Sequence, residues 1–210
     1  MPERTVEDRL REQYFALLPD IRRVAEELET KVRHCLLNIS SRLDRYEQLV
    51  ITSRIKECES AVDALRRRQE GATFDPDRPE HYTLDSLKDL AGVRVSVFPR
   101  SRWNETDKEL RETFSSWEPD PVLDENGELL AFKYYGYCDA SNKVRAEFQV
   151  VPMLTALFWE VEHAAIYKPS PRFKGVTRSL EMKQRTTEVL NALDAFEEEF
   201  ESVVRRYRLV

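Results

Sequence analysis

Cysteine is scarce in this chain of 210 residues, and the three that occur share no regular spacing. They are Cys35, Cys58 and Cys138, which fit neither a disulfide framework nor a zinc-binding pattern. A reducing compartment is therefore expected, and with it a cytoplasmic location. The first residues lack the apolar core of a signal peptide, and the most apolar run, Met153–Trp159, is far too short to cross a bilayer. No membrane is expected among the partners of this chain.

An excess of positive charge is also missing. Lysine and arginine number 33 against 39 aspartate and glutamate residues, which gives a formal net charge of -6. Broad, nonspecific binding to nucleic acid needs a basic surface, so duplex DNA is not an expected partner. One local basic pocket remains compatible with this balance. Charges of both signs are mixed along the chain, which is typical of well-solvated helix surfaces.

The spacing of apolar residues predicts long helices at both ends of the chain. Residues 6–37 carry apolar side chains at helical intervals, with a break or kink expected at Pro19, because proline removes a backbone donor. Residues 176–206 form a second long pattern, whose acidic run Glu197-Glu198-Glu199 is expected on an exposed face. These terminal helices suit packing on a core and equally suit a seam within a homo-oligomer, and the pattern does not decide between them.

Shorter runs of both kinds alternate between these helices. Strands are expected at residues 46–56, 93–98, 129–138 and 143–151, the last two forming a hairpin around residues 139–142. Helical runs are expected at residues 57–69, 86–90, 104–117 and 153–167. This order predicts an α+β domain with a central mixed β-sheet, flanked by N-terminal helices and a long C-terminal helix. Residues 1–210 are taken as one domain, divided into N-terminal helices (1–48), a core (49–170) and a C-terminal helix (176–208).

Two acidic residues stand in separate strand-like contexts. Glu147 lies inside an apolar strand, and Asp89 shortly precedes another. Two carboxylates from different strands of one sheet can hold a magnesium ion, and magnesium with arginine and lysine is the usual apparatus for moving phosphate groups. Asp89 also suits a helix or turn cap. Glu147 also suits a structural salt bridge, with Arg94 or Arg145 as partner, because a buried carboxylate needs a cation.

Three blocks of chemically active residues follow one another along the chain. They are Ser53-Arg54-Ile55-Lys56 with Ser60, then Asp89-Leu90-Ala91-Gly92-Val93-Arg94, then Glu147-Phe148-Gln149 followed by Glu160-Val161-Glu162-His163 and Tyr167-Lys168. In order and spacing these blocks resemble those of the RelA/SpoT-type (p)ppGpp synthetase family, especially its small, single-domain alarmone synthetases. The resemblance extends from about Val50 to Pro169.

The resemblance implies a nucleotidyltransferase-like sheet and transfer of the β,γ-diphosphate of ATP to the 3′-hydroxyl of GDP or GTP, with release of AMP. It implies Mg²⁺ as the cofactor, with Asp89 and Glu147 as ligands. Glu147 would otherwise orient and deprotonate the attacking hydroxyl. Arg54 is expected to stack on adenine, and Lys56 and Ser60 to contact the ATP phosphates. A guanidinium suits such a site because it is flat and always charged.

Three further residues of these blocks receive substrate-binding roles from the resemblance. Arg94 is assigned to the ATP side, while Gln149 and His163 are assigned to the acceptor side; each also suits bracing of the site. A histidine on a helix is more often packed and hydrogen-bonded than active as a proton donor, so His163 has a structural alternative.

The acceptor side departs from the family pattern. The family carries a Gly-Tyr-x-x-x-His block on the strand before the glutamate, and its tyrosine stacks on the acceptor guanine. Here Asn126-Gly127 matches, but Glu128 and Phe132 stand where tyrosine and histidine are expected. An alternative alignment through Gly136-Tyr137 leaves too few residues for the return strand. The preferred hairpin register sets Tyr134 opposite Glu147, on the same face, and makes Tyr134 a candidate stacking residue.

The two halves of the proposed site are thus unequally matched, since the ATP side keeps its residues and the guanine side loses most of them. The sequence predicts binding of ATP and metal with an altered acceptor, either another nucleotide or an RNA 3′ end, as in toxic members of the family. The alternative is a catalytically silent homologue that acts as a regulatory or toxin/defence-associated binding protein.

Overall fold

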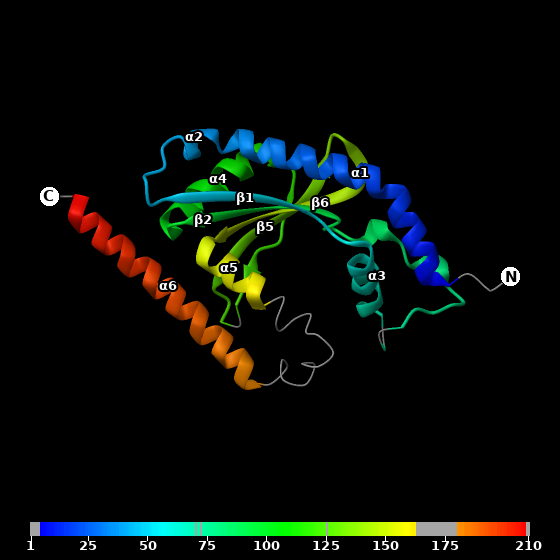
Figure 1. Ribbon diagram of the computed structural model, residues 1–210. Coiled ribbons are helices and arrows are strands. Elements are labelled where there is room, and N and C mark those ends of the chain that lie inside the picture. The colour runs from blue at the N-terminus through cyan, green and yellow to red at the C-terminus, as the bar shows by residue number, and fades with distance from the viewer. Residues whose placement is uncertain (1–4, 70, 72, 125, 163–179, 209–210) are drawn as a thin grey trace.

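A long helix, α1 (Val6–Cys35), lies along a central β-sheet, and the chain ends in a second long helix, α6 (Leu180–Arg208) (Figure 1). The computed structural model describes residues 5–69, 71, 73–124, 126–162 and 180–208. The other α-helices are α2 (Leu37–Ser40), α3 (Cys58–Arg67), α4 (Trp103–Thr113) and α5 (Met153–Glu162). Short 3-10 turns are η2 (Pro79–His81), η3 (Leu84–Ser86) and η4 (Arg100–Arg102). The strands are β1 (Gln48–Ile55), β2 (Ala91–Phe98), β3 (Glu118–Pro119), β4 (Val122–Leu123), β5 (Leu129–Cys138) and β6 (Ser141–Pro152).

The strands form one mixed sheet in the order β1-β2-β6-β5-β3, with β4 also paired to β5. β1 runs antiparallel to β2, β2 runs parallel to β6, and β6 runs antiparallel to β5. The parallel pair requires a long crossover, and α4 lies within the segment that supplies it. This mixed sheet with its flanking helices confirms the α+β architecture predicted from the sequence. Among the helices of the described segments, none combines the length and the apolar character needed to span a bilayer.

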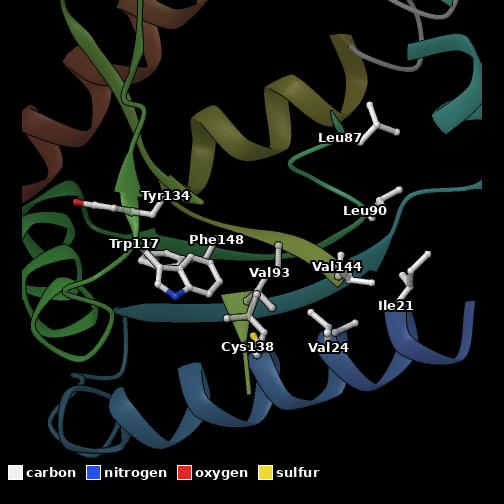
Figure 2. Packing of buried hydrophobic residues seen from close by; sticks show 14 of the residues in the cluster. Ile21, Val24, Leu87, Leu90, Val93, Trp117, Tyr134, Cys138, Val144 and Phe148 are labelled. Atoms are coloured by element: carbon white, nitrogen blue, oxygen red, sulfur yellow. The ribbon is translucent and has the colours of Figure 1, made fainter. Parts of the chain in front are cut away.

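The core lies between the sheet and the helices α1 and α4. Ile21 and Val24 of α1 point toward Val93 and Val144 of the strands, with Phe148 in the same layer (Figure 2). All five side chains are buried, at 2% exposure or less. Burying a side chain of this size contributes about 1.5–3 kcal/mol, so this layer supplies much of the stability of the fold.

The other face of the sheet, here called the open face, carries polar side chains. Gly92 of β2 pairs with Arg54 of β1 on one side and with Glu147 of β6 on the other, so these three positions form one row across the sheet. Side chains alternate along a strand, so Arg94 and Gln149 share this face two residues further along. Helix α5 covers only a part of it, through a small apolar cluster of Ala131, Val151 and Ala156.

Several local predictions need correction at their boundaries. Of the break or kink expected at Pro19, the break is absent, since α1 continues through this residue as a bent helix (Figure 1). The helical turn expected at residues 86–90 is wrong, because the turn lies earlier, at η3, and the backbone of residues 87–90 is not helical. The cause is a backbone hydrogen bond of 2.9 Å from Lys56 N–H to the carbonyl of Leu90, which joins this segment to the end of β1. Of the helix expected at residues 153–167, the part after Glu162 lies outside the described residues.

The β5–β6 hairpin pairs one residue away from the predicted register. Tyr135 stands opposite Glu147, and Tyr134 stands opposite Phe148. The strands connect through residues 139 and 140 alone, and the pairing shifts irregularly near Cys138, so the turn length did not fix the register. Because side chains alternate, a slip of one residue moves Tyr134 to the face covered by the helices. There its ring stacks on Phe148, with centroids 4.7 Å apart, and its hydroxyl donates a 2.7 Å hydrogen bond to Asp107 Oδ1.

Gly136 is required by the packing of Trp117. A Cβ atom at this position would lie 2.4 Å from Trp117 Cδ2. We expect Gly136→Ala to lower the free energy of unfolding by about 1–3 kcal/mol, because the strand and the indole must both shift to accommodate the methyl group. Urea unfolding measures this change. The matched control is Gly92→Ala, whose Cβ would meet no described atom nearer than 3.5 Å and should cost less. Equal losses in both variants would show that strand glycine itself, and not Trp117, sets the requirement.

Helix α6 attaches to the corner between β2 and α4 through its acidic side chains. Glu197 and Glu201 accept hydrogen bonds of 2.8 Å from the backbone N–H groups of Arg100 and Ser101, and Phe200 packs beside them. The expected exposure of the run 197–199 is therefore wrong for Glu197, which is 1% exposed. Burial raises the pKa of Glu197 to about 7. Free N–H groups at the start of a helical segment favour carboxylates, and this explains the burial of an acid here.

Candidate active site

Four charged side chains meet on the open face near the end of β1. Arg54 is the penultimate residue of β1 and Lys56 follows the strand. Asp89 lies two residues before β2, and Glu147 lies inside β6. The Glu147 side chain is 5% exposed, while that of Arg54 is 53% exposed. A buried carboxylate is thus covered by a cation that itself remains accessible to a ligand.

One guanidinium nitrogen brings the two acids together. Arg54 Nη2 donates a 2.8 Å hydrogen bond to Glu147 Oε1 and lies 3.8 Å from Asp89 Oδ2. Lys56 Nζ donates to the same Asp89 oxygen. The site therefore holds two carboxylates and two cations in direct contact, and its charges balance without a ligand. The cap expected as the alternative for Asp89 is not found, since Asp89 pairs with cations. Glu147 does form a salt bridge, as its structural alternative expects, but with Arg54 and not with Arg94 or Arg145.

Backbone features explain why these four groups converge. Gly92 separates Arg54 from Glu147, and a Cβ there would lie 3.5 Å from Arg54 Nε and 3.6 Å from Glu147 Cγ. The missing side chain leaves room for Arg54 to cross β2 and reach Glu147. The backbone of Lys56 is fixed by the Leu90 carbonyl and by the hydroxyl of Tyr14, which donates a 2.7 Å hydrogen bond to the Lys56 carbonyl.

A chain of hydrogen bonds connects Glu147 to the residues further along the open face. Gln149 Nε2 donates to Glu147 Oε1 at 3.0 Å, and Arg94 Nε donates to Gln149 Oε1 at 3.3 Å. Arg94 also lies 3.6 Å from Glu160 of α5. Burial, and then the charge of Arg54, lower the pKa of the Arg94 guanidinium, which still keeps its charge near neutral pH. Arg94 and Gln149 are therefore placed to hold Glu147 in one orientation.

Tyr135 is the functional candidate that sequence reasoning missed. It stands directly opposite Glu147 on the neighbouring strand, so the two side chains share the open face. Burial, and then the charges of Glu147, Asp120 and Asp89, raise the pKa of this phenol well above its ordinary value, so it stays a neutral donor. A hairpin turn over residues 139–142 predicts Tyr134 opposite Glu147, and the observed pairing differs from that register by one residue. The signal in the sequence was the Tyr134-Tyr135 pair itself, in which one ring must face each side of the sheet.

The remaining predicted residues lie at the margin of the site or beyond the described chain. Ser60 is half-buried in the first turn of α3, shortly after Lys56. Tyr134 lies on the opposite face of the sheet from Glu147 and does not join the open face. Phe132, at the position aligned with the family histidine, also takes that opposite face and packs on Trp103. His163 lies outside the described residues.

The donor set suits magnesium rather than a closed metal site. In the part of the chain that the structure describes, no three His, Cys, Asp or Glu side chains gather closely enough to enclose a metal ion. Magnesium is usually held by one or two carboxylates, with waters and substrate phosphates completing the shell. Asp89 and Glu147 supply such a pair, with the half-exposed Arg54 and the mostly buried Lys56 in contact with it.

Comparison with known proteins gives a match at the level of structure. No family model and no curated protein matches the sequence. The small alarmone synthetase 1 from Bacillus subtilis is similar over 93% of this chain and 99% of its own, with a TM-score of 0.65 and 18% identity. The same protein has been solved bound to AMPCPP and bound to its product pppGpp, with TM-scores of 0.60 and 0.61. A GTP pyrophosphokinase family protein from Streptococcus pneumoniae is similar over 93% of this chain and 96% of its own, with a TM-score of 0.60 and 21% identity. Because the sequence identities are this low, the structural match establishes the architecture alone. The chain has the fold of the small alarmone synthetases.

Proposed function

We propose that this chain is a magnesium-dependent diphosphotransferase, which moves the β,γ-diphosphate of ATP to the 3′-hydroxyl of a nucleotide or of an RNA 3′ end. The observation that carries the proposal is the convergence of Asp89 and Glu147 on one nitrogen of Arg54. The structural neighbours support the donor and the reaction class, since one of them was solved with AMPCPP and with pppGpp. GDP and GTP are the first acceptors to test, and the loss of the guanine-stacking tyrosine from its expected position favours a changed acceptor.

The charges of the site match the donor. In the nucleotide complex, Arg54 and Lys56 would exchange their carboxylate partners for the adenine ring and the phosphates of ATP, because Arg54 is half exposed and Lys56 lies beside the same acids. Asp89 and Glu147 would then hold Mg²⁺, which supplies positive charge to the diphosphate as it is transferred. The half-exposed Arg54 thus neutralises the two carboxylates in the free protein and would bind the substrate in the complex.

The transfer follows from the position of Glu147. The 3′-oxygen of the acceptor attacks the β-phosphorus of ATP, the bond between that phosphorus and the α,β-bridging oxygen breaks, and AMP leaves with the bridging oxygen. The proton of the hydroxyl passes to the Glu147 carboxylate. Gln149 donates a hydrogen bond to this carboxylate, and Tyr135 stands opposite it on β5, so both act as positioning residues for the base.

The test of the proposed function is direct. The purified protein is incubated with magnesium, with ATP labelled in the diphosphate, and with GDP, GTP, ATP or tRNA as the acceptor. We expect AMP together with a labelled diphosphorylated product from at least one acceptor. The absence of both products with every acceptor would contradict the proposal and favour a silent binding protein of the same fold.

The neighbouring tyrosines Tyr134 and Tyr135 provide a matched pair of variants. Tyr135→Phe removes the hydroxyl of the side chain that stands opposite the proposed base and is expected to lower kcat by about tenfold or more, with little change in the free energy of unfolding. Tyr134→Phe leaves buried Asp107 without its 2.7 Å partner and is expected to lower the free energy of unfolding by about 1–3 kcal/mol, with kcat nearly unchanged. Steady-state kinetics and urea unfolding of both variants check this. A lower kcat in Tyr134→Phe together with a lower stability in Tyr135→Phe would instead support the register predicted from the sequence and exclude Tyr135 from the site.

A further inference from the structure

Three cations surround Tyr135 on the open face. Lys88 Nζ lies 5.3 Å from the centroid of the ring, Lys133 Nζ lies 5.5 Å from it, and the Arg145 guanidinium carbon lies 5.8 Å from it. They come from the segment before β2, from β5 and from β6, so strand pairing gathers them around one side chain. None of the three belongs to a block that resembles the family motifs.

Two carboxylates from the edge of the sheet contact these cations. Glu118 of β3 pairs with Lys88 at 3.5 Å and also with Arg145. Asp120 pairs with Lys133 at 3.4 Å. The Glu118 and Asp120 side chains are 53% and 55% exposed, so both reach the cations from the solvent side. Within the described chain, the buried Arg145 Nε has no hydrogen-bond partner, while Nη2 of the same guanidinium pairs with Glu118.

We propose that Lys88, Lys133 and Arg145 form a subsite for the 5′-phosphates of the acceptor, and that Glu118 and Asp120 fill it in the free protein. The inference rests on the proposed function, since the acceptor hydroxyl is placed at Glu147. Tyr135 stands opposite Glu147 on the neighbouring strand, and the cations surround its ring, so the base and the subsite adjoin each other. A nucleotide carries its 3′-hydroxyl and its 5′-phosphates on different sides of the ribose, and this arrangement matches both.

Carboxylate and phosphate oxygens accept hydrogen bonds from the same donors. The oxygens of Glu118 and Asp120 therefore occupy places that phosphate oxygens would take. A diphosphate or triphosphate brings more negative charge than these two side chains and exchanges with them, at the cost of their ion pairs. Exposed ion pairs of this kind are weak, so the exchange is readily reversible. The two acids would accordingly set the affinity for the acceptor and discriminate against acceptors with few phosphates.

Binding of inorganic tripolyphosphate, followed by titration calorimetry without magnesium, tests the subsite. All variants are made in a Lys56→Met background, which weakens competing binding on the ATP side. We expect Glu118→Gln with Asp120→Asn to tighten binding by about tenfold, because two like charges leave the vicinity of the ligand. Lys133→Met with Arg145→Met is expected to weaken it by about tenfold. The controls are Glu112→Gln and Lys143→Met, exposed residues outside the cluster, which should leave binding unchanged.

The outcomes separate this inference from the proposed function. If the acid variant binds no more tightly than its control, the ion pairs only hold β3 on the sheet and the subsite is refuted, even in an active enzyme. If both shifts occur in a chain that makes no AMP, the anion site stands and the transfer reaction fails. In an active enzyme that keeps Lys56, the acid variant should also lower KM for GTP about tenfold while leaving KM for guanosine unchanged, and equal changes for both would overturn the assignment to phosphates.

Discussion

Glu147→Gln is expected to lower the rate of diphosphate transfer by about 10²–10⁴-fold, which is the usual contribution of a general base. Glutamine keeps the shape of the side chain and an oxygen that accepts the hydrogen bond from Arg54. It carries no negative charge, so it neither takes a proton from the acceptor hydroxyl nor helps to hold magnesium. The fold should tolerate the change because Arg54 is half exposed and can turn toward solvent. AMP release from labelled ATP measures the effect.

Two further variants test whether the loss of rate in Glu147→Gln is specific to this carboxylate. Glu112→Gln makes the same chemical change at an exposed position of α4, where the carboxylate lies 4.0 Å from Lys108, and should leave the rate unchanged. Asp89→Asn removes the other carboxylate and should cause a loss of similar size, with a raised magnesium requirement. A Glu147→Gln protein with the full rate would remove this residue from the chemistry, and the site would then need a different base.

The sequence predicts the open face well where a side-chain pattern of period two is enough. Arg54 and Lys56 flank an apolar residue, and Glu147 and Gln149 flank Phe148, so each pair shares one face of its strand. The pairings of Gly92 with Arg54 and with Glu147 then bring both strands into one row. Local alternation and the order of three motifs therefore carry enough information to place the charged cluster.

The same reasoning fails where a turn sets the register. The choice between Tyr134 and Tyr135 depends on the residues that connect β5 to β6, and an irregular pairing near Cys138 shifts the register by one. A single-residue slip exchanges the two faces, so the wrong tyrosine was assigned to the site. Periodicity within a strand carries no information about such a slip.

The sequence pattern also did not predict the burial of a side chain that contacts an element far away along the chain. Glu197 lies in a run of three acids that resembles a solvated helix face, yet it caps the backbone at Arg100 and is buried. Helical periodicity identified α6 but did not indicate where it docks. Contacts of this kind depend on tertiary structure, and the carboxylate that meets free N–H groups is chosen by the docking geometry.

Phe148→Ala is expected to lower the free energy of unfolding by about 3–5 kcal/mol, the usual cost of deleting a buried aromatic ring. Phe148 has 0% exposure, and its ring centroid lies 5.0 Å from that of Phe114, 5.4 Å from that of Trp117 and 4.7 Å from that of Tyr134. These rings lie in contact on the helix-covered face, so the cavity left by alanine cannot close without moving several of them. Urea unfolding at equilibrium measures the loss.

The effect should be confined to one face of the hairpin. Tyr137→Ala removes an aromatic side chain that is 55% exposed, and it should cost less than about 1 kcal/mol. Phe148 lies next to Glu147 on β6, so Phe148→Ala also tests whether the core positions the base. Below its lowered melting temperature, the variant should still catalyse the transfer but with a reduced kcat. The strand that carries Glu147 has then lost the packing that fixes it. Equal destabilisation by the two variants would show that the aromatic cluster is not the centre of the core. An unchanged kcat in Phe148→Ala would show that the hydrogen bonds from Arg54 and Gln149 alone suffice to position Glu147.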